Sequence, residues 1–339
     1  MRSMSQTTPL TAKDFASDQT VKWCPGCGDY AVLKQVQSVL STLGLKREEI
    51  VFVSGIGCSS RFPYYMNTYG MHSIHGRAPA VATGLKTTRP ELSVWVVTGD
   101  GDGLSIGGNH LIHLFRRNPD VNVLLFNNEI YGLTKGQFSP TSKPGLHTQS
   151  SPLGSIGKPF NAASLALGAG ATFVARTLDR NPQHLREVLR QAHRHKGTSF
   201  IEIYQNCPVF NDGAFEKFTD KRTRAVRALY AEAGKPLRFG EQSELGIRLD
   251  GLKPKVVSAT RCAADELWIH DSRDKVKAQL LAAYFEVEKD RPQVFGVLYR
   301  EERPTYEELL QAQMREAIAR KGAGNLDDLL LGTDFWAVT

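Results

Sequence analysis

Four cysteines are the residues of this chain whose types and spacing most clearly suggest chemistry. Cys24 and Cys27 form a Cys-Pro-Gly-Cys motif, and Cys58 and Cys207 lie in loops next to glycine or proline. Thiolates on separate loops can converge in space and then bind an iron–sulfur cluster or zinc. A thioredoxin-like redox dithiol would stand alone before a helix. We therefore interpret the four cysteines as one metal-ligand set.

A second signal is the turn Gly99-Asp100-Gly101, which follows an apolar segment, with Asn127-Asn128 after the next such segment. Glycines permit a tight turn and close approach of the backbone to a phosphate. The Asp100 carboxylate and the Asn128 amide oxygen are ligands that Mg²⁺ shares with phosphate oxygens. The pattern predicts a diphosphate and metal site and resembles those of the thiamine diphosphate kind. Such a cofactor beside a one-electron acceptor indicates oxidative cleavage of a carbonyl compound, with electrons passed to a carrier protein.

The elements that must position these residues are short apolar strands alternating with helices. Strands are expected near 50–53, 92–98, 121–126, 171–175 and 199–204, and helices near 28–45, 74–89, 105–118, 161–168 and 181–196. This alternation predicts an α/β fold with a mainly parallel sheet covered by helices on both faces. Ligands collect at the carboxyl ends of such strands. Cys58, Asp100 and Asn128 each follow a strand end, which predicts one shared site.

Changes in composition and in the alternation of apolar segments divide the chain into three parts. We expect an N-terminal arm at 1–20, the α/β domain at 21–213, and a C-terminal extension at 214–339 that docks a subunit or acts as a lid. Within the extension we expect a hairpin-like pair near 255–260 and 293–299, and a helix near 305–321. Residues 131–160 form a long loop rich in Gly, Ser, Thr and Pro, a length that is usually functional or disordered.

Composition excludes several classes of protein. With 41% apolar and 23% charged residues, the chain is typical of a soluble globular protein. It has no apolar run of roughly 20 residues and no signal-peptide core at its start, so we expect no membrane association and a cytoplasmic location. Five cysteines in such a chain do not indicate a disulfide framework. We expect Cys262 to be an ordinary, partly buried cysteine.

The net charge of +7 has several interpretations. Nucleic-acid binding is one, but the basic residues are scattered and form no dense tract. A basic surface that attracts an acidic protein or substrate explains the sign equally well, and an ordinary solvated surface is the commonest explanation. Arg61 and Lys135 follow the predicted cofactor loops; they could bind the distal carboxylate of a dicarboxylate substrate or be ordinary surface charges. His75, at the start of a predicted helix, could contact cofactor or substrate, or could be structural.

Taken together, these motifs resemble the beta subunits of 2-oxoacid:ferredoxin oxidoreductases, especially the 2-oxoglutarate branch. The resemblance covers roughly residues 20–210. The matching stretches are Trp23-Cys24-Pro25-Gly26-Cys27-Gly28, Gly55-Ile56-Gly57-Cys58-Ser59-Ser60-Arg61, His75-Gly76-Arg77-Ala78, Gly99-Asp100-Gly101-Asp102-Gly103 and the run from Asn127 to Gln137.

The resemblance implies a thiamine diphosphate-binding fold and a set of site residues. Mg²⁺ would be held by Asp100, Asn128 and the backbone carbonyl of Ile130, and a [4Fe–4S] cluster by Cys24, Cys27, Cys58 and Cys207. The catalytic candidates are His75, near the thiazolium, with Arg61 and Lys135. The residues expected to line the cofactor are Ile56, Gly57, Cys58, Ser59, His75, Gly101, Asp102, Gly132 and Leu133.

The implied reaction is the coenzyme A-dependent oxidative decarboxylation of 2-oxoglutarate to succinyl-CoA and CO₂. Electrons would pass through the cluster to ferredoxin, and the reverse direction would fix CO₂. Thiamine enzymes need a glutamate to activate the cofactor, and in this family it comes from the alpha subunit; Glu129 would be misplaced for that role. We therefore expect the chain to be inactive alone and to join a larger alpha subunit in a dimer of heterodimers.

Alternatives remain at this stage. The same core would suit pyruvate, or a branched-chain or aryl 2-oxoacid. A different class of function is a basic, zinc-stabilised nucleic-acid-binding protein. A non-redox thiamine decarboxylase is disfavoured, because it would need no set of cysteines.

Overall fold

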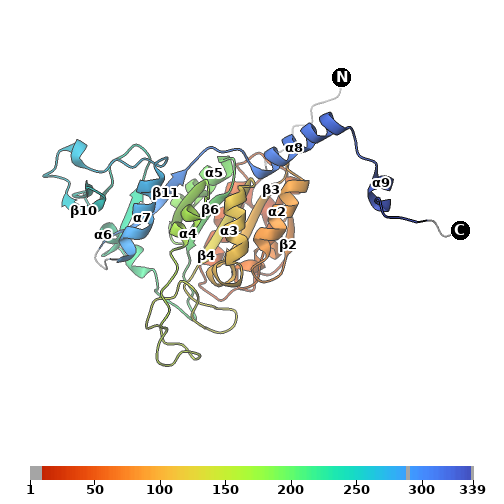
Figure 1. Cartoon of the computed structure of the whole chain (residues 1–339). Coiled ribbons are helices and arrows are strands. Elements are labelled where there is room, and N and C mark those ends of the chain that lie inside the picture. The colour runs from red at the N-terminus through yellow and green to blue at the C-terminus, as the bar shows by residue number, and fades with distance from the viewer. Residues whose placement is uncertain (1–9, 288–290, 337–339) are drawn as a thin grey trace, which may run out of the picture.

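The centre of the protein is an eight-stranded sheet, seen in a computed structural model that describes residues 10–287 and 291–336 (Figure 1). The strand order is β2-β1-β3-β4-β6-β5-β11-β7, and every neighbouring pair is parallel except β5 with β11. The strands are β1 Ile50–Ser54, β2 Tyr69–His72, β3 Ser93–Gly99, β4 Val121–Asn127, β5 Phe173–Leu178, β6 Ser199–Tyr204, β7 Ala228–Ala231 and β11 Gln293–Arg300. The predicted mainly parallel sheet is confirmed.

Helices cover both faces of this sheet. Helices α1 (Asp29–Leu40) and α5 (Pro182–Arg194) contribute to the core on one face. The helices that contribute to the core on the other face are α2 Ala78–Thr88, α3 Gly108–Arg117, α4 Ala162–Gly168 and α7 Lys275–Val287. Figure 1 shows α2, α3 and α4 side by side over the sheet. Two buried cores therefore hold the sheet between layers, as expected for this fold class.

Local sequence explains why these elements form. All seven residues of β4 are buried, which is the pattern of a parallel strand covered on both faces. Helix α5 buries Leu185, Val188, Leu189 and Ala192, an i, i+3, i+4, i+7 stripe. Its start is fixed by Asn181, whose side chain accepts a hydrogen bond from the backbone N–H of His184 at 3.2 Å.

The region after residue 214 is built differently from the sequence prediction. The expected hairpin between 255–260 and 293–299 is wrong, because β10 (Lys253–Ser258) pairs with β9 (Leu245–Asp250) while β11 pairs with β5 and β7. A tight turn joins β9 to β10 directly, and local pairing of that kind costs less loop entropy than a distant one. Strands β7 and β11 join the main sheet, so this sheet includes strands from beyond residue 213, where the α/β domain was expected to end.

The remaining elements are short or project from the body. Strand β8 (Arg238–Phe239) completes a small antiparallel sheet with β9, and α6 spans Arg224–Arg227. The predicted helix near 305–321 is confirmed as α8 (Tyr306–Lys321), which is followed by α9 (Leu326–Leu331). Of the expected N-terminal arm, residues 1–9 lie outside the described part. No helix among the described residues is long and apolar enough to cross a membrane.

Burial of His184 makes the stability of the fold depend on pH. Its Nδ1 is 2.8 Å from the hydroxyl of Thr177, and its ring packs edge-on against Tyr230 at 4.8 Å. Desolvation lowers the pKa of His184 to about 4. The unfolded chain therefore binds this proton more readily than the folded chain, so stability should fall as pH decreases from about 6.5 and be fully reduced below about 4.

We expect His184→Gln, which keeps a hydrogen-bonding side chain but cannot titrate, to show a smaller loss of stability between pH 7 and pH 4.5 than the unmodified chain. Urea unfolding at each pH measures the difference. His147→Gln, at an exposed position in the 131–160 loop, is the matched control and should follow the unmodified chain. Identical pH profiles for His184→Gln and the unmodified chain would contradict the assignment.

Candidate functional site

The predicted cofactor residues surround one cavity of about 160 Å³ at the carboxyl ends of β1, β3 and β4. The nine lining residues expected from the sequence are Ile56, Gly57, Cys58, Ser59, His75, Gly101, Asp102, Gly132 and Leu133, and all of them border it. The three expected metal ligands, Asp100, Asn128 and Ile130, border it as well. The sheet thus brings together predicted residues that are up to 77 positions apart in the chain, Ile56 and Leu133 being the outermost of these twelve.

The buried carboxylate of Asp102 ties three loops together at this cavity. Its Oδ1 accepts hydrogen bonds from the backbone N–H groups of Ile56 at 3.0 Å and Gly76 at 2.7 Å. Its Oδ2 accepts one from the hydroxyl of Thr98 at 2.6 Å, and Oδ1 also lies 2.5 Å from Nδ1 of His75. The sequence predicted that Asp102 lines the cofactor, and the structure adds that its side chain is committed to protein groups.

The same contact orients His75. Because Nδ1 faces the Asp102 carboxylate, the ring orientation is fixed and Nε2 is the nitrogen left for other partners. The side chain borders the cavity and is 38% exposed, so it can still reach a bound molecule. This arrangement is the one expected of a histidine that holds or transfers a proton at a fixed position.

Asp100 is buried and is held by the 131–160 loop. Its Oδ2 lies 2.5 Å from the hydroxyl of Ser139 and 2.6 Å from that of Thr141. Burial raises the pKa of Asp100, and the two hydroxyl donors act in the opposite direction. Asn128 Oδ1 accepts a hydrogen bond from the backbone N–H of Ile130 at 3.2 Å. The long loop therefore has a defined role, which the sequence did not reveal for Ser139 and Thr141.

Close packing explains why Gly101 is a glycine. A Cβ atom at this position would lie 2.2 Å from the ring of Tyr131, whose hydroxyl donates a hydrogen bond to the Gly101 carbonyl at 2.9 Å. A π-helical turn, η4 (Asp102–Ile106), follows immediately and leads into α3. Helical N-termini present free N–H groups and favour anions, and π-helical turns often mark functional sites.

The four cysteines expected to bind the cluster lie near the same cavity. Cys58 borders it, and a Cβ atom on Gly132 would be 3.6 Å from the Sγ of Cys58 and 3.7 Å from that of Cys207. Burial raises the pKa of Cys58 to about 12, and the charges of Asp29 and of the neighbouring Cys207 and Cys24 add to this. Burial likewise raises the pKa of Cys27, as do the charges of Asp29, Cys207 and Cys58.

All four thiols are free, and they are near enough to influence one another's ionisation. In the part of the chain that the structure describes, no three His, Cys, Asp or Glu side chains form a group that could hold a metal ion. Cys262 is also free, partly buried, and lies beyond β10.

Gln205 links Asn128, an expected metal ligand, to the cysteines, and sequence reasoning missed it. Its Oε1 accepts a hydrogen bond from Nδ2 of Asn128 at 3.0 Å. Its Nε2 lies 3.4 Å from the Sγ of Cys27 and also donates to the backbone carbonyl of Asn206. The residue follows β6 directly, so the rule that ligands gather at strand ends could have found it.

The two predicted substrate cations are not brought to the cavity. Arg61 donates to the backbone carbonyl of Lys22 at 3.1 Å, and Lys135 is exposed on the loop beyond it. Neither borders the cavity, and their role as substrate contacts stays a prediction. Glu129 pairs with Lys143 at 2.9 Å, and burial raises its pKa.

The parallel sheet, the strand-end turns and the cavity define a protein of the thiamine diphosphate-binding class. Residues 55–203 match the family model described as the thiamine pyrophosphate enzyme C-terminal TPP-binding domain. A solved structure of 2-oxoglutarate:ferredoxin oxidoreductase from Magnetococcus marinus, with 2-oxoglutarate, coenzyme A and succinyl-CoA bound, is 33% identical. The alignment covers 96% of each chain with a TM-score of 0.76.

Sequence relatives narrow the class further. The chain is 52% identical over 334 residues to the 2-oxoglutarate oxidoreductase subunit KorB of Mycobacterium tuberculosis, covering 97% of this chain and 89% of that one. It is 39% identical over 251 residues to the beta subunit of 2-oxoacid:ferredoxin oxidoreductase 2 of Aeropyrum pernix, covering 69% and 81%. The chain therefore belongs to the beta subunits of the 2-oxoacid:ferredoxin oxidoreductases, and the resemblance drawn from its motifs is confirmed.

We expect Asp102→Asn to lower the free energy of unfolding by about 2 kcal/mol or more, because an amide cannot accept from all the donors that the carboxylate satisfies. Urea unfolding measures this. Asp18→Asn removes the same charge from an exposed side chain and should change stability by less than about 0.5 kcal/mol. Equal stability of the two variants would show that the Asp102 contacts do not hold the loops.

Proposed function

We propose that this chain and an alpha subunit together catalyse the oxidative decarboxylation of 2-oxoglutarate. One 2-oxoglutarate and one coenzyme A give succinyl-CoA and CO₂, and two electrons reduce two molecules of ferredoxin one at a time. The reverse direction would fix CO₂. The observation that carries this proposal is that Cys58 borders the cavity of the predicted cofactor site and, across Gly132, lies near Cys207. A carbon–carbon cleavage site and a one-electron acceptor are then neighbours.

The residues at the cavity fit thiamine diphosphate and Mg²⁺. Asp100, Asn128 and the Ile130 carbonyl supply the oxygen donors that Mg²⁺ prefers, and the turn at Gly101 permits close approach of a diphosphate. Thiamine diphosphate, when bound, supplies a carbon nucleophile and an electron sink. His75 is fixed through Nδ1 and offers Nε2 to hold or move a proton next to the reacting carbonyl.

Cys24, Cys27, Cys58 and Cys207 are the proposed ligands of an iron–sulfur cluster, for which [4Fe–4S] is the proposed form, and the support is that these thiols are near enough to influence one another's ionisation. Such a cluster, when bound, accepts and passes on single electrons. The pKa of Cys58, raised by burial, means that its thiol is protonated at neutral pH in the metal-free chain. Cluster binding must therefore displace protons, which favours assembly at higher pH.

A partner must complete the site. A cavity of about 160 Å³ is smaller than the roughly 300–1,000 Å³ of typical small-molecule pockets, which supports a site that a second subunit helps to enclose. Glu129 is engaged with Lys143, which supports the expectation that the activating glutamate comes from an alpha subunit. A dimer of heterodimers that docks ferredoxin, located in the cytoplasm, is the proposed form.

The substrate is proposed as 2-oxoglutarate rather than pyruvate. The support comes from two similar proteins: KorB of M. tuberculosis is a 2-oxoglutarate oxidoreductase subunit, and the M. marinus enzyme is a 2-oxoglutarate:ferredoxin oxidoreductase. Arg61 and Lys135 were expected to hold its distal carboxylate, but they lie outside the cavity of this chain.

We expect the chain co-purified anaerobically with its alpha subunit to reduce a viologen dye with 2-oxoglutarate and coenzyme A at least tenfold faster than with pyruvate. The chain alone should show no turnover, because its site is incomplete. Asp100→Ala should abolish Mg²⁺-dependent cofactor binding and turnover while the cluster stays intact. Faster reduction with pyruvate would overturn the substrate, and turnover by the Asp100→Ala complex would overturn the metal site.

We expect Cys207→Ser to lose most of the brown colour, visible absorption and iron of the anaerobically purified protein, since a hydroxyl is a poor substitute for a thiolate ligand. Cys262→Ser is the matched control and should keep both. An unmodified protein that is colourless and binds zinc would contradict the cluster and favour the zinc interpretation. Full cluster content in Cys207→Ser would show that the fourth ligand is another residue.

A further inference from the structure

A long groove runs beside α5 on the side of the sheet opposite to α7. It consists of two hollows of about 1040 and 590 Å³ that share Glu187, Gln191 and Arg300 as lining residues. The first lies at the C-terminal end of α5, and the second between α5 and strands β7 and β11, next to Tyr230 and Val297. Together they extend along the whole of α5, which at 1.5 Å per residue is about 20 Å.

This groove marks a place where the sheet lacks a helix. Strands of a mainly parallel sheet are normally covered on both faces. On the α1 and α5 side, the described residues place α5 over β5 and β6, while β11 receives its main helical cover from α7 on the opposite face. The side of β7 and β11 that faces the groove is therefore open to a helix from elsewhere.

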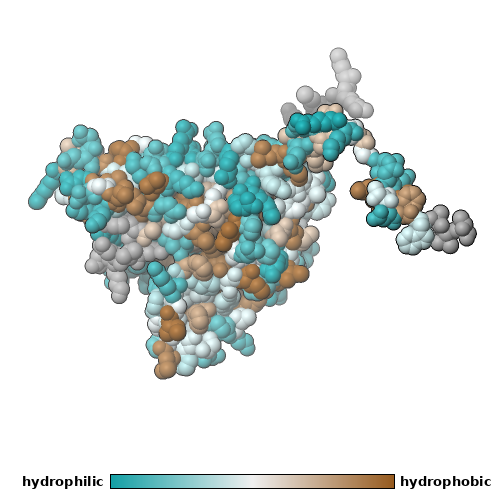
Figure 2. Space-filling model, viewed as in Figure 1, coloured by the Kyte–Doolittle hydropathy of each residue, from teal (hydrophilic) through white to brown (hydrophobic). Residues whose placement is uncertain are grey.

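The chain carries such a helix in its C-terminal arm, which we define as residues 306–336. Figure 1 shows α8 and α9 projecting away from the body, and Figure 2 shows apolar residues on the projecting part. Trp336 is 83% and Leu329 78% exposed. The other large exposed apolar residues of the arm are Leu309, Met314, Ile318, Leu326, Leu330, Leu331 and Phe335. So much apolar surface on one short segment is the mark of an interaction site.

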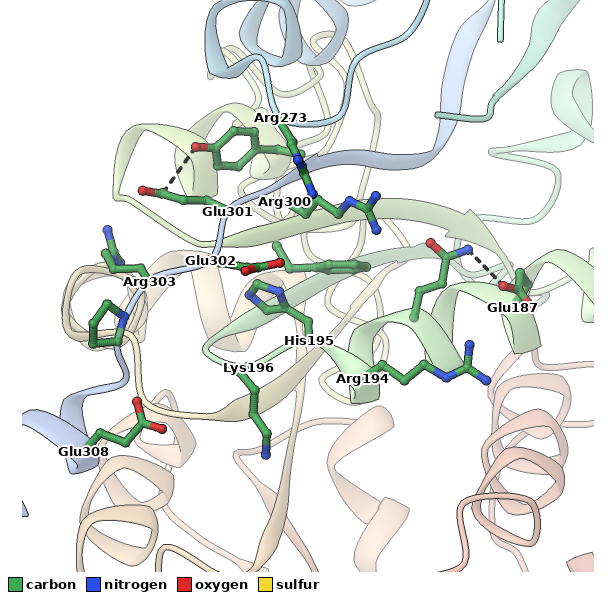
Figure 3. A pocket seen from close by; sticks show the side chains of 14 residues that line it. Glu187, Arg194, His195, Lys196, Arg273, Arg300, Glu301, Glu302, Arg303 and Glu308 are labelled. Carbon is green, nitrogen blue, oxygen red and sulfur yellow. Dashed lines mark hydrogen bonds between the residues drawn. The ribbon is translucent and has the colours of Figure 1, made fainter. Parts of the chain in front are cut away.

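The charges of the arm and the groove are complementary. The arm holds six acidic and three basic residues, a net charge of −3 in a chain of net +7, and after Lys321 its only charged residues are Asp327, Asp328 and Asp334. The groove presents several arginines: Figure 3 shows Arg273 and Arg300 close together on one wall and Arg194 on α5.

These three arginines are available for new partners. Among the described residues, Arg194, Arg273 and Arg300 form no ion pair. Most acidic residues of the same hollow are already engaged, since Glu187 pairs with Arg190 and accepts from Gln191, and Glu308 caps its own helix. Glu301 lies 3.2 Å from the hydroxyl of Tyr299, which leaves Glu302 as the free acid there.

The arm cannot fill the groove of its own chain. Its base is fixed where the Asn118 side chain donates to the Pro304 carbonyl at 3.3 Å and the buried Glu307 accepts from the Asp120 N–H at 3.2 Å. From there the 16-residue α8 carries the distal part about 24 Å away from the body. Glu308, at the base, already borders the groove, so the tip lies far from it.

A second copy of the chain can cover both the groove and the apolar arm, because its arm can enter the groove of the first copy and its groove can receive the arm of the first copy. In a two-fold arrangement, the tip of each arm lies at the base of the other, and each groove receives one tip. A helix of the length of α9 is about 9 Å long and 10 Å wide, or roughly 700 Å³, which the larger hollow can hold. We propose that α9 of one copy docks in the groove beside α5 of a second copy, with its leucines on the sheet and its aspartates on the arginines.

Photo-crosslinking within the assembled complex tests the contact. A photo-reactive amino acid at Leu330, in the full chain purified with its alpha subunit, should give a product with the mass of two copies of this chain, with the attachment mapped to α5 or β11. The same amino acid at Leu252, an exposed position in the β9–β10 turn, is the control and should give no such product. Attachment to the alpha subunit, or to another surface of this chain, would overturn the proposal.

Charge exchange gives an independent test. The double variant Arg273→Glu with Arg300→Glu should weaken the association of two heterodimers, each of one copy of this chain and one alpha subunit, at least tenfold. The double variant Asp327→Arg with Asp328→Arg should have the same effect. Analytical ultracentrifugation measures the association. Combining all four changes should restore association. Arg248→Glu with Lys253→Glu, on the small sheet, is the control and should have no effect. Failure of either double variant to weaken association would overturn the proposal. Viologen reduction, measured in parallel, reports separately on the proposed function.

Discussion

The functional end of this molecule depends on the burial of one carboxylate, that of Asp102. A buried charge is stable only when its hydrogen-bonding capacity is satisfied, and here the donors come from the loop after β1, the turn before α2 and the end of β3. The same hydrogen bonds also hold the loops in place, because each loop must stay close enough to Asp102 for its N–H or O–H group to donate. It also restricts the sequence nearby: a Cβ atom on Gly55 would lie 1.9 Å from Asp102 Oδ2. The cavity is the space that these fixed loops enclose.

A second buried network extends from the middle of the sheet to Asp100, in the turn after β3. Arg176 Nε lies 2.7 Å from Glu202 Oε2, and Glu202 Oε1 accepts from Asn127 Nδ2 at 2.8 Å. The Thr141 hydroxyl is 2.9 Å from Asn127 Oδ1 and 2.6 Å from Asp100 Oδ2. A fully buried ion pair adds little net stability, but it specifies one arrangement, because any other would leave a charge unpaired. The pair thus fixes the position of Asn127 and, through Thr141, of Asp100.

Those parts of the fold and site that depend on neighbouring residues could be predicted from the sequence. Buried strands appear in the sequence as runs of apolar residues, and parallel strands end at a common edge of the sheet. The residues after β1, β3 and β4 could therefore be predicted to share one site. The hairpin prediction failed because the partner of β11 is decided by packing between distant segments, which leaves no local pattern. Ser139 and Thr141 were missed for a related reason: their loop has no periodicity, and only the folded chain shows that it returns to Asp100.

The same principle, that a parallel sheet must be covered and its site enclosed, explains why this chain is a subunit. At the carboxyl edge of the sheet the cavity, at about 160 Å³, is smaller than a typical small-molecule pocket. At the edge of the sheet, β7 and β11 have one uncovered face, and a helical arm with unburied leucines and aspartates leaves the body beside Asn118 and Asp120. Neither the small cavity nor the uncovered strand face stabilises an isolated chain, because apolar surface that stays exposed to water contributes no hydrophobic stabilisation. A surface that covers either one supplies that stabilisation, which is the physical reason for the two contacts that we propose, with the alpha subunit at the cavity and with a second copy at the groove.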